Sequence, residues 1–426
     1  MEFKKQNFET YNLHTVKLDT FKESRIEIVF RDNVAKDNYL KCIFLADLLT
    51  YSSSKYPRRK DMVIQTEELY QTSIFSNASR LGKSLILTLG CNFINPEYVN
   101  EKDYLENIIE FLSEIIFNPN VKENAFDETS FKIIQNDLIA NLETLKETPT
   151  RVASYNAFNL LNDDSSTKIY LDNYTKEDIL DITPEDIYEF YKYVLEHFIC
   201  DVFIVGNLDY GLVNKLINKN IKLKTIKNHT VNLYEENMVR KKALVKKDES
   251  SFNQSTILLI YNLVNLTEKE KLYAIHLFDY IFCNGSFKSK LFKSLREDNS
   301  LCYGVSSFYM KFDKLYGIKV SLAKENVNKA LKIIDKSLKE MIAGKFNDEC
   351  IEEAKKAILN TLKTSTDEIY CYTTDCFLHE IDDFPPFNER TKSYRKLNKE
   401  DIINISQKLK LNISYVLEDG GNNARN

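Results

Sequence analysis

The chain has 426 residues, of which 43% are hydrophobic and 28% charged, a composition typical of globular proteins built from domains of about 100–200 residues. A net charge of −5 excludes the broad basic field that would hold a nucleic-acid backbone, so we expect no nucleic-acid partner. The eight cysteines are scattered through apolar segments, which predicts reduced thiols rather than disulfides.

The first residues of the chain lack both the apolar core of a secretory signal and the Arg-rich character of an organelle transit peptide. No apolar run in the sequence approaches the ~18 residues that a membrane-spanning helix needs. We therefore expect a cytoplasmic protein with no membrane span.

The first half of the chain alternates between helical and strand patterns. Apolar residues at a period of about 3.6 predict helices, whereas β-branched and partly alternating stretches predict strands. In chain order we expect a helix at 39–50, a strand at 81–89, helices at 104–116 and 126–145, and a helix opening at 185–187 that leads into a strand at 201–205.

Segments of the second half resemble segments of the first half in the same order. Residues 338–342 match 112–116, and residues 400–402 match 185–187, with a separation that falls steadily along the chain. The separation between matching segments falls in this way when a domain is duplicated and the second copy has shorter loops. The second half predicts a helix at 287–295, strands at 303–310 and 315–323, helices at 327–342 and 348–362, and a helix opening at 400–402 that leads into a strand at 413–417.

We therefore predict an α+β fold of two tandem homologous domains, each a mixed β-sheet covered by helices. The first repeat should span residues 1–210 and the second residues 252–426. Residues 211–251, with their alternating charges, should form a linker that contains one exposed strand.

Arg296 and Tyr303 are the candidate functional residues of the second repeat. Arg296 follows the predicted helix and Tyr303 opens the predicted strand, so the turn between them can bring both side chains to one wall of a cavity. A guanidinium group stays protonated and can hold a carbonyl or carboxylate through two donors. The residues alone leave open a simpler alternative, in which Arg296 pairs with Glu297 or Asp298 at the surface and Tyr303 is a core aromatic.

The stretch from Leu295 to Ser307 resembles the substrate-binding signature of the insulinase/pitrilysin-like zinc peptidases, and residues 56–70 are similar to the non-catalytic subunits of bacterial pitrilysin-like pairs. The resemblance implies a half-shell of the mitochondrial-processing-peptidase type, in which Arg296 and Tyr303 bind the substrate backbone near the scissile bond. Cys302 departs from the small Ala that is usual at its position in the family.

Active members of that family carry H-x-x-E-H on one helix, which places two zinc ligands one turn apart with a carboxylate base beside the metal-bound water. No two of the five histidines (14, 197, 229, 276 and 379) have this spacing. When this chain is aligned with those active members, the motif falls on Phe44-Leu45-Ala46-Asp47-Leu48. Phe44 and Leu48 then stand at the two histidine positions and cannot bind zinc. We therefore expect no metal ligands and no catalytic residue in this chain.

Two other possible metal sites are weak. The stretch from Cys371 through Cys376 to His379 offers two thiols and an imidazole but no fourth donor, which favours buried free cysteines on a helix. His14 and His197 stand alone in the sequence, and a lone histidine is usually structural.

The resemblance implies a non-catalytic subunit of a heterodimeric zinc metallopeptidase that processes peptides. In such a pair, a zinc-bearing homologue would cleave the peptide that Arg296 and Tyr303 help to bind, and this chain would need no cofactor of its own. Two alternatives remain, an inactive scaffold of the same fold and a peptide-binding homodimer. A neighbouring gene that encodes H-x-x-E-H would favour the heterodimer.

Overall fold

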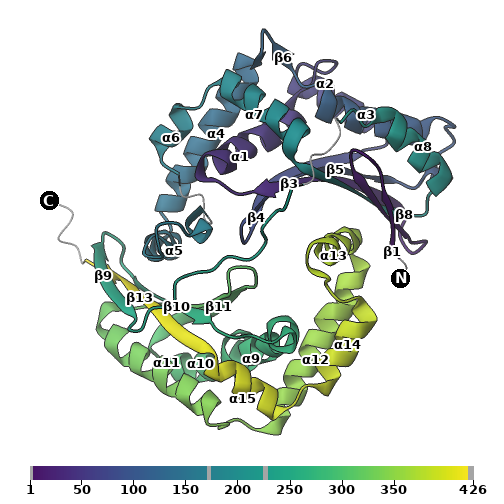
Figure 1. Ribbon diagram of the computed structural model, residues 1–426. Helices are drawn as coiled ribbons and strands as arrows, with labels where there is room; N and C mark the ends of the chain where they lie inside the picture. Colours follow the sequence, from purple (N-terminus) through teal and green to yellow (C-terminus); the bar gives the residue numbers. More distant parts are fainter. Residues whose placement is uncertain (1–2, 170–173, 224–228, 421–426) are drawn as a thin grey trace. The chain divides into compact units, whose positions relative to one another are not determined.

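The computed structural model describes residues 3–169, 174–223 and 229–420, which form two compact units (Figure 1). Unit 1 consists of Met1–Leu142, Tyr174–Leu233 and Thr366–Phe384, and unit 2 consists of Glu143–Asn173, Tyr234–Ser365 and Pro385–Asn426. None of the helices in the described part of the chain combines the length and the apolar character that a membrane-spanning helix needs.

In its described residues, unit 1 is a six-stranded mixed sheet with helices on its two faces. The strand order is β1-β2-β8-β3-β5-β4, and a small β6–β7 ladder lies outside the sheet. The elements are β1 (Phe3–Asn7), β2 (Asn12–Lys17), β3 (Glu23–Asn33), α1 (Lys36–Tyr51), α2 (Arg59–Glu68), β4 (Ser73–Leu81), β5 (Ser84–Ile94), α3 (Tyr104–Phe117), β6 (Val121–Lys122), β7 (Ala125–Phe126), α4 (Glu128–Lys146), α6 (Lys176–Leu180), α7 (Pro184–His197), β8 (Ile199–Gly206), α8 (Tyr210–Asn220) and α13 (Ile369–Asp382).

Two apolar cores form on the two faces of this sheet because successive side chains of a strand point to opposite sides. On β3, Ile26 and Ile28 join the large core under α1, α3, α4, α7 and α8. Val29 of the same strand points the other way, where it packs with Phe203 of β8 and Phe377 of α13. Figure 1 shows α13 on the face opposite α1 and α7.

Unit 2 repeats this plan with a five-stranded sheet in the described residues, ordered β11-β12-β10-β13-β9. Short π-helical turns at Glu270–Ala274, Tyr280–Asn284 and Lys293–Glu297 interrupt its first helical region. The remaining elements are α5 (Pro149–Phe158), β9 (Leu244–Ser250), β10 (Ser255–Leu263), α9 (Ile275–Asp279), α10 (Lys290–Phe292), β11 (Cys302–Met310), β12 (Leu315–Leu322), α11 (Val327–Ile342), α12 (Asp348–Thr364), α14 (Phe387–Lys396), α15 (Lys399–Gln407) and β13 (Leu409–Asp419).

The strand orders of the two units match, which confirms the predicted α+β fold of two homologous halves. β4, β5, β3, β8 and β2 of unit 1 correspond in order to β11, β12, β10, β13 and β9 of unit 2. In each unit the last strand of its repeat pairs antiparallel with the central strand on one side and parallel with a further strand on the other. The predicted helices at 104–116, 126–145, 327–342 and 348–362 are confirmed as α3, α4, α11 and α12.

A phenylalanine packed over a glycine recurs in the two sheets. Phe75 of β4 lies opposite Gly90 of β5, and Phe308 of β11 lies opposite Gly317 of β12. A Cβ atom on Gly317 would lie 2.0 Å from Cζ of Phe308, and one on Gly90 would lie 2.5 Å from Cζ of Phe75. Only a residue without a side chain therefore fits beneath each ring.

These cross-strand pairs correct two details of the sequence alignment. Gly317 corresponds to Gly90, so the match of 81–89 with 315–323 was out of register. The prediction of one strand over 81–89 was also wrong, because β4 ends at Leu81 and a turn with Gly82 at a φ of +56° leads into β5. Strands buried on two faces have apolar residues in succession instead of an alternating pattern. The sequence of such a strand therefore does not indicate how its residues align with those of its counterpart in the other repeat.

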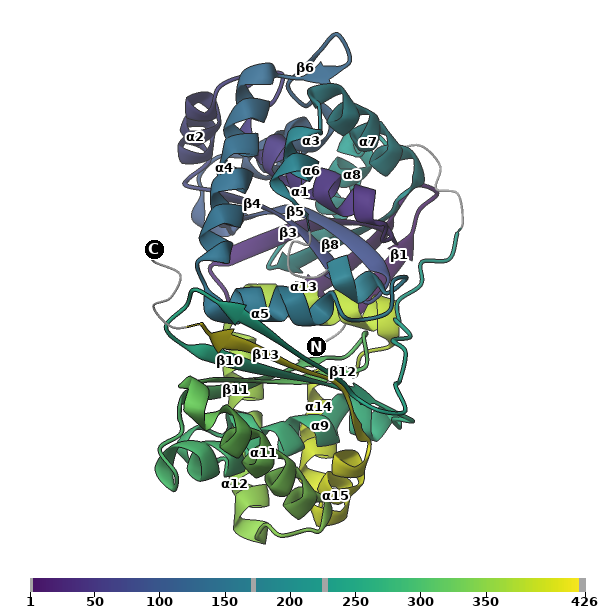
Figure 2. The same ribbon diagram turned by 90° about the vertical axis from the view of Figure 1, so that its left-hand side faces the viewer.

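Each sheet is covered on one face by a helix from the other half of the sequence. α13 packs on β8 and β3 of unit 1, whereas α5 packs on β10 and β13 of unit 2, as Figure 2 shows for α5. The compact units therefore divide the chain differently from the expected repeats, 1–210 and 252–426.

The range 211–251 holds more regular structure than a simple linker. Most of α8 falls in it, and β9 within it is the exposed strand that the sequence predicted. Residues 224–228 of this range lie outside the described residues.

Candidate functional site

Arg296 and Tyr303 meet at the beginning of β11. Nη1 of Arg296 donates a hydrogen bond of 2.8 Å to the main-chain carbonyl of Tyr303. The predicted helix-to-strand turn thus brings the two residues together, although through the backbone of Tyr303 rather than its side chain. The substrate-binding role of the pair stays a prediction.

An irregular turn makes this approach possible. The helix that carries Arg296 ends in the π-helical turn Lys293–Glu297, and the main-chain nitrogen of Leu301 then bonds the carbonyl of Leu295 at 2.8 Å. Ser300 has a φ of +50°, a left-handed conformation that reverses the chain direction. The backbone returns beside the helix end, so that β11 starts next to the Arg296 side chain.

Tyr303 is the extra residue of a β-bulge. Cys302 pairs with Leu322 and Gly304 pairs with the next residue, Ser321, which leaves Tyr303 without a partner on β12. Its side chain is 70% exposed, so the alternative that Tyr303 is a core aromatic is wrong. A bulge redirects the side chain of the extra residue and is common beside functional sites.

The Arg296 guanidinium lies beside an aromatic ring. Its central carbon lies 5.3 Å from the ring centroid of Phe292, within the range of a cation–π contact. Phe287, which is 69% exposed, packs edge-to-face on Phe292 at 5.1 Å between centroids. Burial raises the pKa of the nearby Cys302 thiol and the charge of Arg296 opposes that shift, so Cys302 is a neutral thiol at neutral pH. The patch therefore offers one cation, a phenol and apolar rings.

The segment aligned with the zinc motif lies in the apolar core of unit 1. Phe44 and Leu45 of α1 are fully buried, and the ring of Phe44 stacks on Phe131 with centroids 5.2 Å apart. Loss of hydration raises the pKa of Asp47, and the charge of Asp137 raises it further. At the positions where active members of the insulinase/pitrilysin-like family have metal ligands, this chain thus has side chains that pack in the core. These side chains cannot hold a zinc ion.

The sequence predicted buried free cysteines on a helix, which is confirmed for Cys376, whereas Cys371 is only half-buried. Cys371 and Cys376 belong to α13, where Cys376 is buried and neither forms a disulfide. The ring of His379 stacks on Phe3, and its Nδ1 lies 3.1 Å from the carbonyl oxygen of Phe384.

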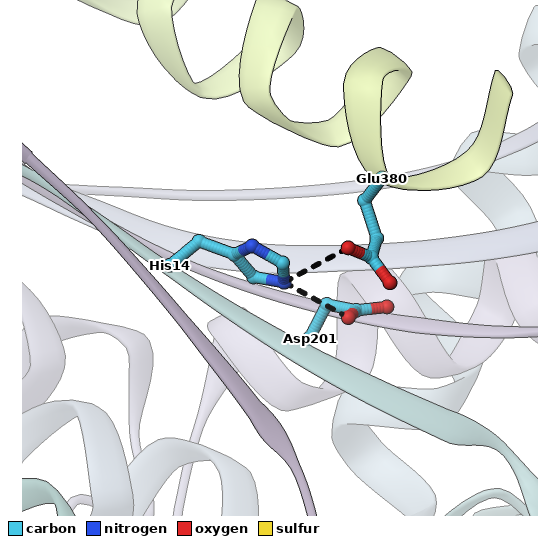
Figure 3. A group of neighbouring side chains, drawn as sticks. All are labelled: His14, Asp201 and Glu380. Atoms are coloured by element: carbon cyan, nitrogen blue, oxygen red, sulfur yellow. Dashed lines mark hydrogen bonds and ion pairs between the residues drawn. The ribbon is translucent and has the colours of Figure 1, made fainter. Parts of the chain in front are cut away.

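His14, Asp201 and Glu380 form a cluster of polar side chains that sequence reasoning missed (Figure 3). His14 does not stand alone, because its Nε2 lies 3.2 Å from Oδ1 of Asp201, a residue 187 positions away in the sequence. The one available signal was a carboxylate within the apolar predicted strand at 201–205. A buried carboxylate needs polar or charged partners, but the neighbouring sequence does not identify them.

Comparisons with known proteins agree with this architecture. A family model described as the peptidase M16 inactive domain matches residues 181–358. A protein of Bacillus subtilis strain 168, named probable inactive metalloprotease YmfF, is 24% identical over 414 residues, which cover 95% of each chain.

Solved structures show the same fold at low sequence identity. A conserved protein from Enterococcus faecalis V583 superposes with a TM-score of 0.92 at 22% identity and 99% coverage of both chains. A peptidase M16 inactive domain from Pseudomonas fluorescens gives a TM-score of 0.80 at 14% identity and 98% coverage of both. The chain thus resembles the peptidase M16 inactive domain in sequence over residues 181–358 and shares its fold with a solved structure of such a domain.

Proposed function

We propose that this chain is the non-catalytic, peptide-binding subunit of a heterodimeric zinc metallopeptidase of the cytoplasm. The observation that carries the proposal is the bulge at Tyr303, which Arg296 holds through the carbonyl and which leaves the Tyr303 side chain exposed beside the guanidinium. An exposed bulge of this kind has no role in the core of unit 2. It fits a surface that binds a ligand, because bulges are common beside functional sites.

The chemistry of the pair suits a peptide backbone. The guanidinium has five N–H donors, of which one bonds the Tyr303 carbonyl, so the others can reach a peptide carbonyl or carboxylate. The Tyr303 hydroxyl can donate to an oxygen that gains negative charge during cleavage. The exposed ring of Phe287 adds an apolar surface for a substrate side chain.

Zinc would come from the partner subunit, an M16 homologue that carries H-x-x-E-H. Phe44 and Leu48 cannot replace its histidines, so the two subunits would divide the work between metal chemistry and substrate binding.

The test is reconstitution with the H-x-x-E-H homologue encoded in the same genome. We expect a stable complex by size-exclusion chromatography and cleavage of fluorogenic peptides by the mixture only. Arg296→Ala should lower kcat/KM roughly ten- to a hundredfold, because a charged hydrogen bond is worth about 1.5–3 kcal/mol. Lys293→Ala, which removes a positive charge from the same helical turn, should have no such effect.

Each alternative has its own outcome. Normal cleavage by the Arg296→Ala mixture would overturn the substrate-binding role and leave a scaffold. A stable homodimer that binds peptide but ignores the homologue would identify the homodimeric alternative. Cleavage by the isolated chain in a chelator-sensitive manner would contradict the non-catalytic assignment itself.

A further inference from the structure

Three potential metal donors of unit 1 converge on one point, each from a different element (Figure 3). His14 lies on β2, Asp201 on β8 and Glu380 on α13. Nε2 of His14 lies 3.2 Å from Oδ1 of Asp201 and 4.0 Å from Oε2 of Glu380. One ligand atom from each residue falls within 4.8 Å of the other two.

The outer oxygens of both carboxylates are held by cations. Arg31 Nε donates to Oδ2 of Asp201 at 2.9 Å, and Lys5 Nζ donates to Oε1 of Glu380 at 2.7 Å. The inner oxygens face His14, and Oδ1 of Asp201 also accepts a hydrogen bond of 2.9 Å from Nδ2 of Asn12. Bound metals commonly have such outer partners, which orient the ligand atoms before the ion arrives.

Neighbouring side chains also hold the imidazole in place. The ring of His14 stacks on Phe203 with centroids 4.5 Å apart and an interplanar angle of 15°. Phe203 in turn packs edge-to-face on Phe377 of α13. The ring cannot turn away from the two carboxylates without disturbing this aromatic stack.

The group borders a cavity of about 300 Å³, whose walls include His14, Glu380, Cys376 and His379. Asp201 lies beneath it and is fully buried. A water molecule in this cavity would supply the fourth ligand of a metal ion held by the three donors and so complete its coordination.

We propose that His14, Asp201 and Glu380 bind a zinc ion that fixes α13 to the sheet of unit 1. With Zn–ligand bonds of about 2.0–2.1 Å, neighbouring ligands of a tetrahedral site lie roughly 3.3 Å apart. The His14–Asp201 distance is already close to this value, and Glu380 must move inward by about 1 to 1.5 Å, since the three ligand atoms lie within 4.8 Å of one another. An imidazole ligand favours zinc over calcium or magnesium, which prefer oxygen donors.

The site would be structural and separate from the catalytic zinc of the partner subunit. In the sequence, α13 is flanked on both sides by segments of unit 2, although it packs in unit 1. A metal that joins Glu380 of α13 to β2 and β8 would hold this inserted helix against its sheet.

The first test measures metal binding by the isolated full-length chain, without partner or peptide. After treatment with a chelator, the wild type should bind one zinc ion in competition with a chromophoric chelator. His14→Gln should weaken the affinity by more than about tenfold, since loss of even an outer-shell partner costs 10–100-fold. His379→Gln is the matched control, because His379 lines the same cavity outside the three-donor group.

Glu380→Gln gives an independent check, since the Glu380 side chain is partly exposed and its replacement leaves the buried His14–Asp201 pair intact. Zinc should slow hydrogen exchange in α13 of the wild type and not in either variant. Absence of stoichiometric zinc, or equal zinc affinity in His14→Gln and the wild type, would overturn the proposal. His14 would then serve only as a hydrogen-bond partner of Asp201.

Discussion

Nη1 of Arg296 lies 2.8 Å from the main-chain carbonyl oxygen of Tyr303, the residue that forms the β-bulge at the start of β11. This contact couples the two candidate residues, because the same guanidinium that is expected to bind peptide also fixes the backbone that presents the phenol. Loss of Arg296 therefore removes a charged donor and loosens the bulge at once. Substitutions of the Tyr303 side chain separate the two effects.

Tyr303→Phe should reduce cleavage by the reconstituted complex without changing the stability of this subunit. A neutral hydrogen bond is worth about 0.5–1.5 kcal/mol, so we expect kcat/KM to fall about two- to tenfold. The melting temperature should stay the same because the ring is 70% exposed. Tyr98→Phe, an exposed tyrosine of unit 1, should leave both quantities unchanged, and an equal loss in that control would refute a specific role for Tyr303.

Restoring histidines at the aligned zinc positions should destabilise unit 1 rather than create a peptidase. Phe44→His removes a stacked ring from a fully buried site, at a cost on the order of 3 kcal/mol or more. The Phe44→His/Leu48→His variant should unfold at lower urea concentration than the wild type and cleave no peptide alone. Lys36→His, an exposed change on the same helix, should shift stability by less than about 0.5 kcal/mol.

The glycines beneath the two phenylalanine rings should not tolerate alanine. Gly317→Ala places a methyl group against Phe308 and should lower the stability of unit 2 by about 1–3 kcal/mol. Removing the ring in Gly317→Ala/Phe308→Ala should recover part of this loss, which a double-mutant cycle of urea unfolding measures. Gly304→Ala is the control, because a Cβ atom there meets no atom within 4 Å.

Glu270 should make the stability of unit 2 depend on acid pH. Burial acts to raise its pKa, but hydrogen bonds from Lys408, at 2.6 Å, and from Thr267 outweigh burial and hold the pKa below its usual value. A lowered folded pKa stabilises the protein above the ordinary glutamate pKa of about 4.3, and this stability is lost as the pH falls through the lower value.

The measurement is the midpoint of urea unfolding between about pH 7 and pH 3. Glu270→Gln should be less stable than the wild type at neutral pH, and the difference should shrink in acid. Glu268→Gln provides a matched control, since the Glu268 side chain is 76% exposed. A constant difference between Glu270→Gln and wild type at every pH would contradict the assignment.

Helices were predicted more accurately than strand register or long-range contacts. The apolar stripes of α3 and α11 repeat along one helix face, so their bounds could be inferred from the local sequence alone. β5 and β12 are buried on two faces and lack alternation, which is why the alignment of their segments slipped. The Arg296–Tyr303 pair was identified from the resemblance of residues 295–307 to the substrate-binding signature of the insulinase/pitrilysin-like peptidases, since the spacing alone did not favour a functional role.

The amino-acid sequence by itself determined the duplication, the two-domain α+β class, the absence of the zinc motif and the place of Arg296 and Tyr303, because each depends on residue type and local spacing. Tertiary structure alone decided the bulge that exposes Tyr303, the packing of α13 on the sheet of unit 1 and the meeting of His14 with Asp201 and Glu380. Those features arise when strands pair and when a helix distant in the sequence buries its apolar face. The local periodicity of a segment does not identify the strand or the sheet with which that segment will pack.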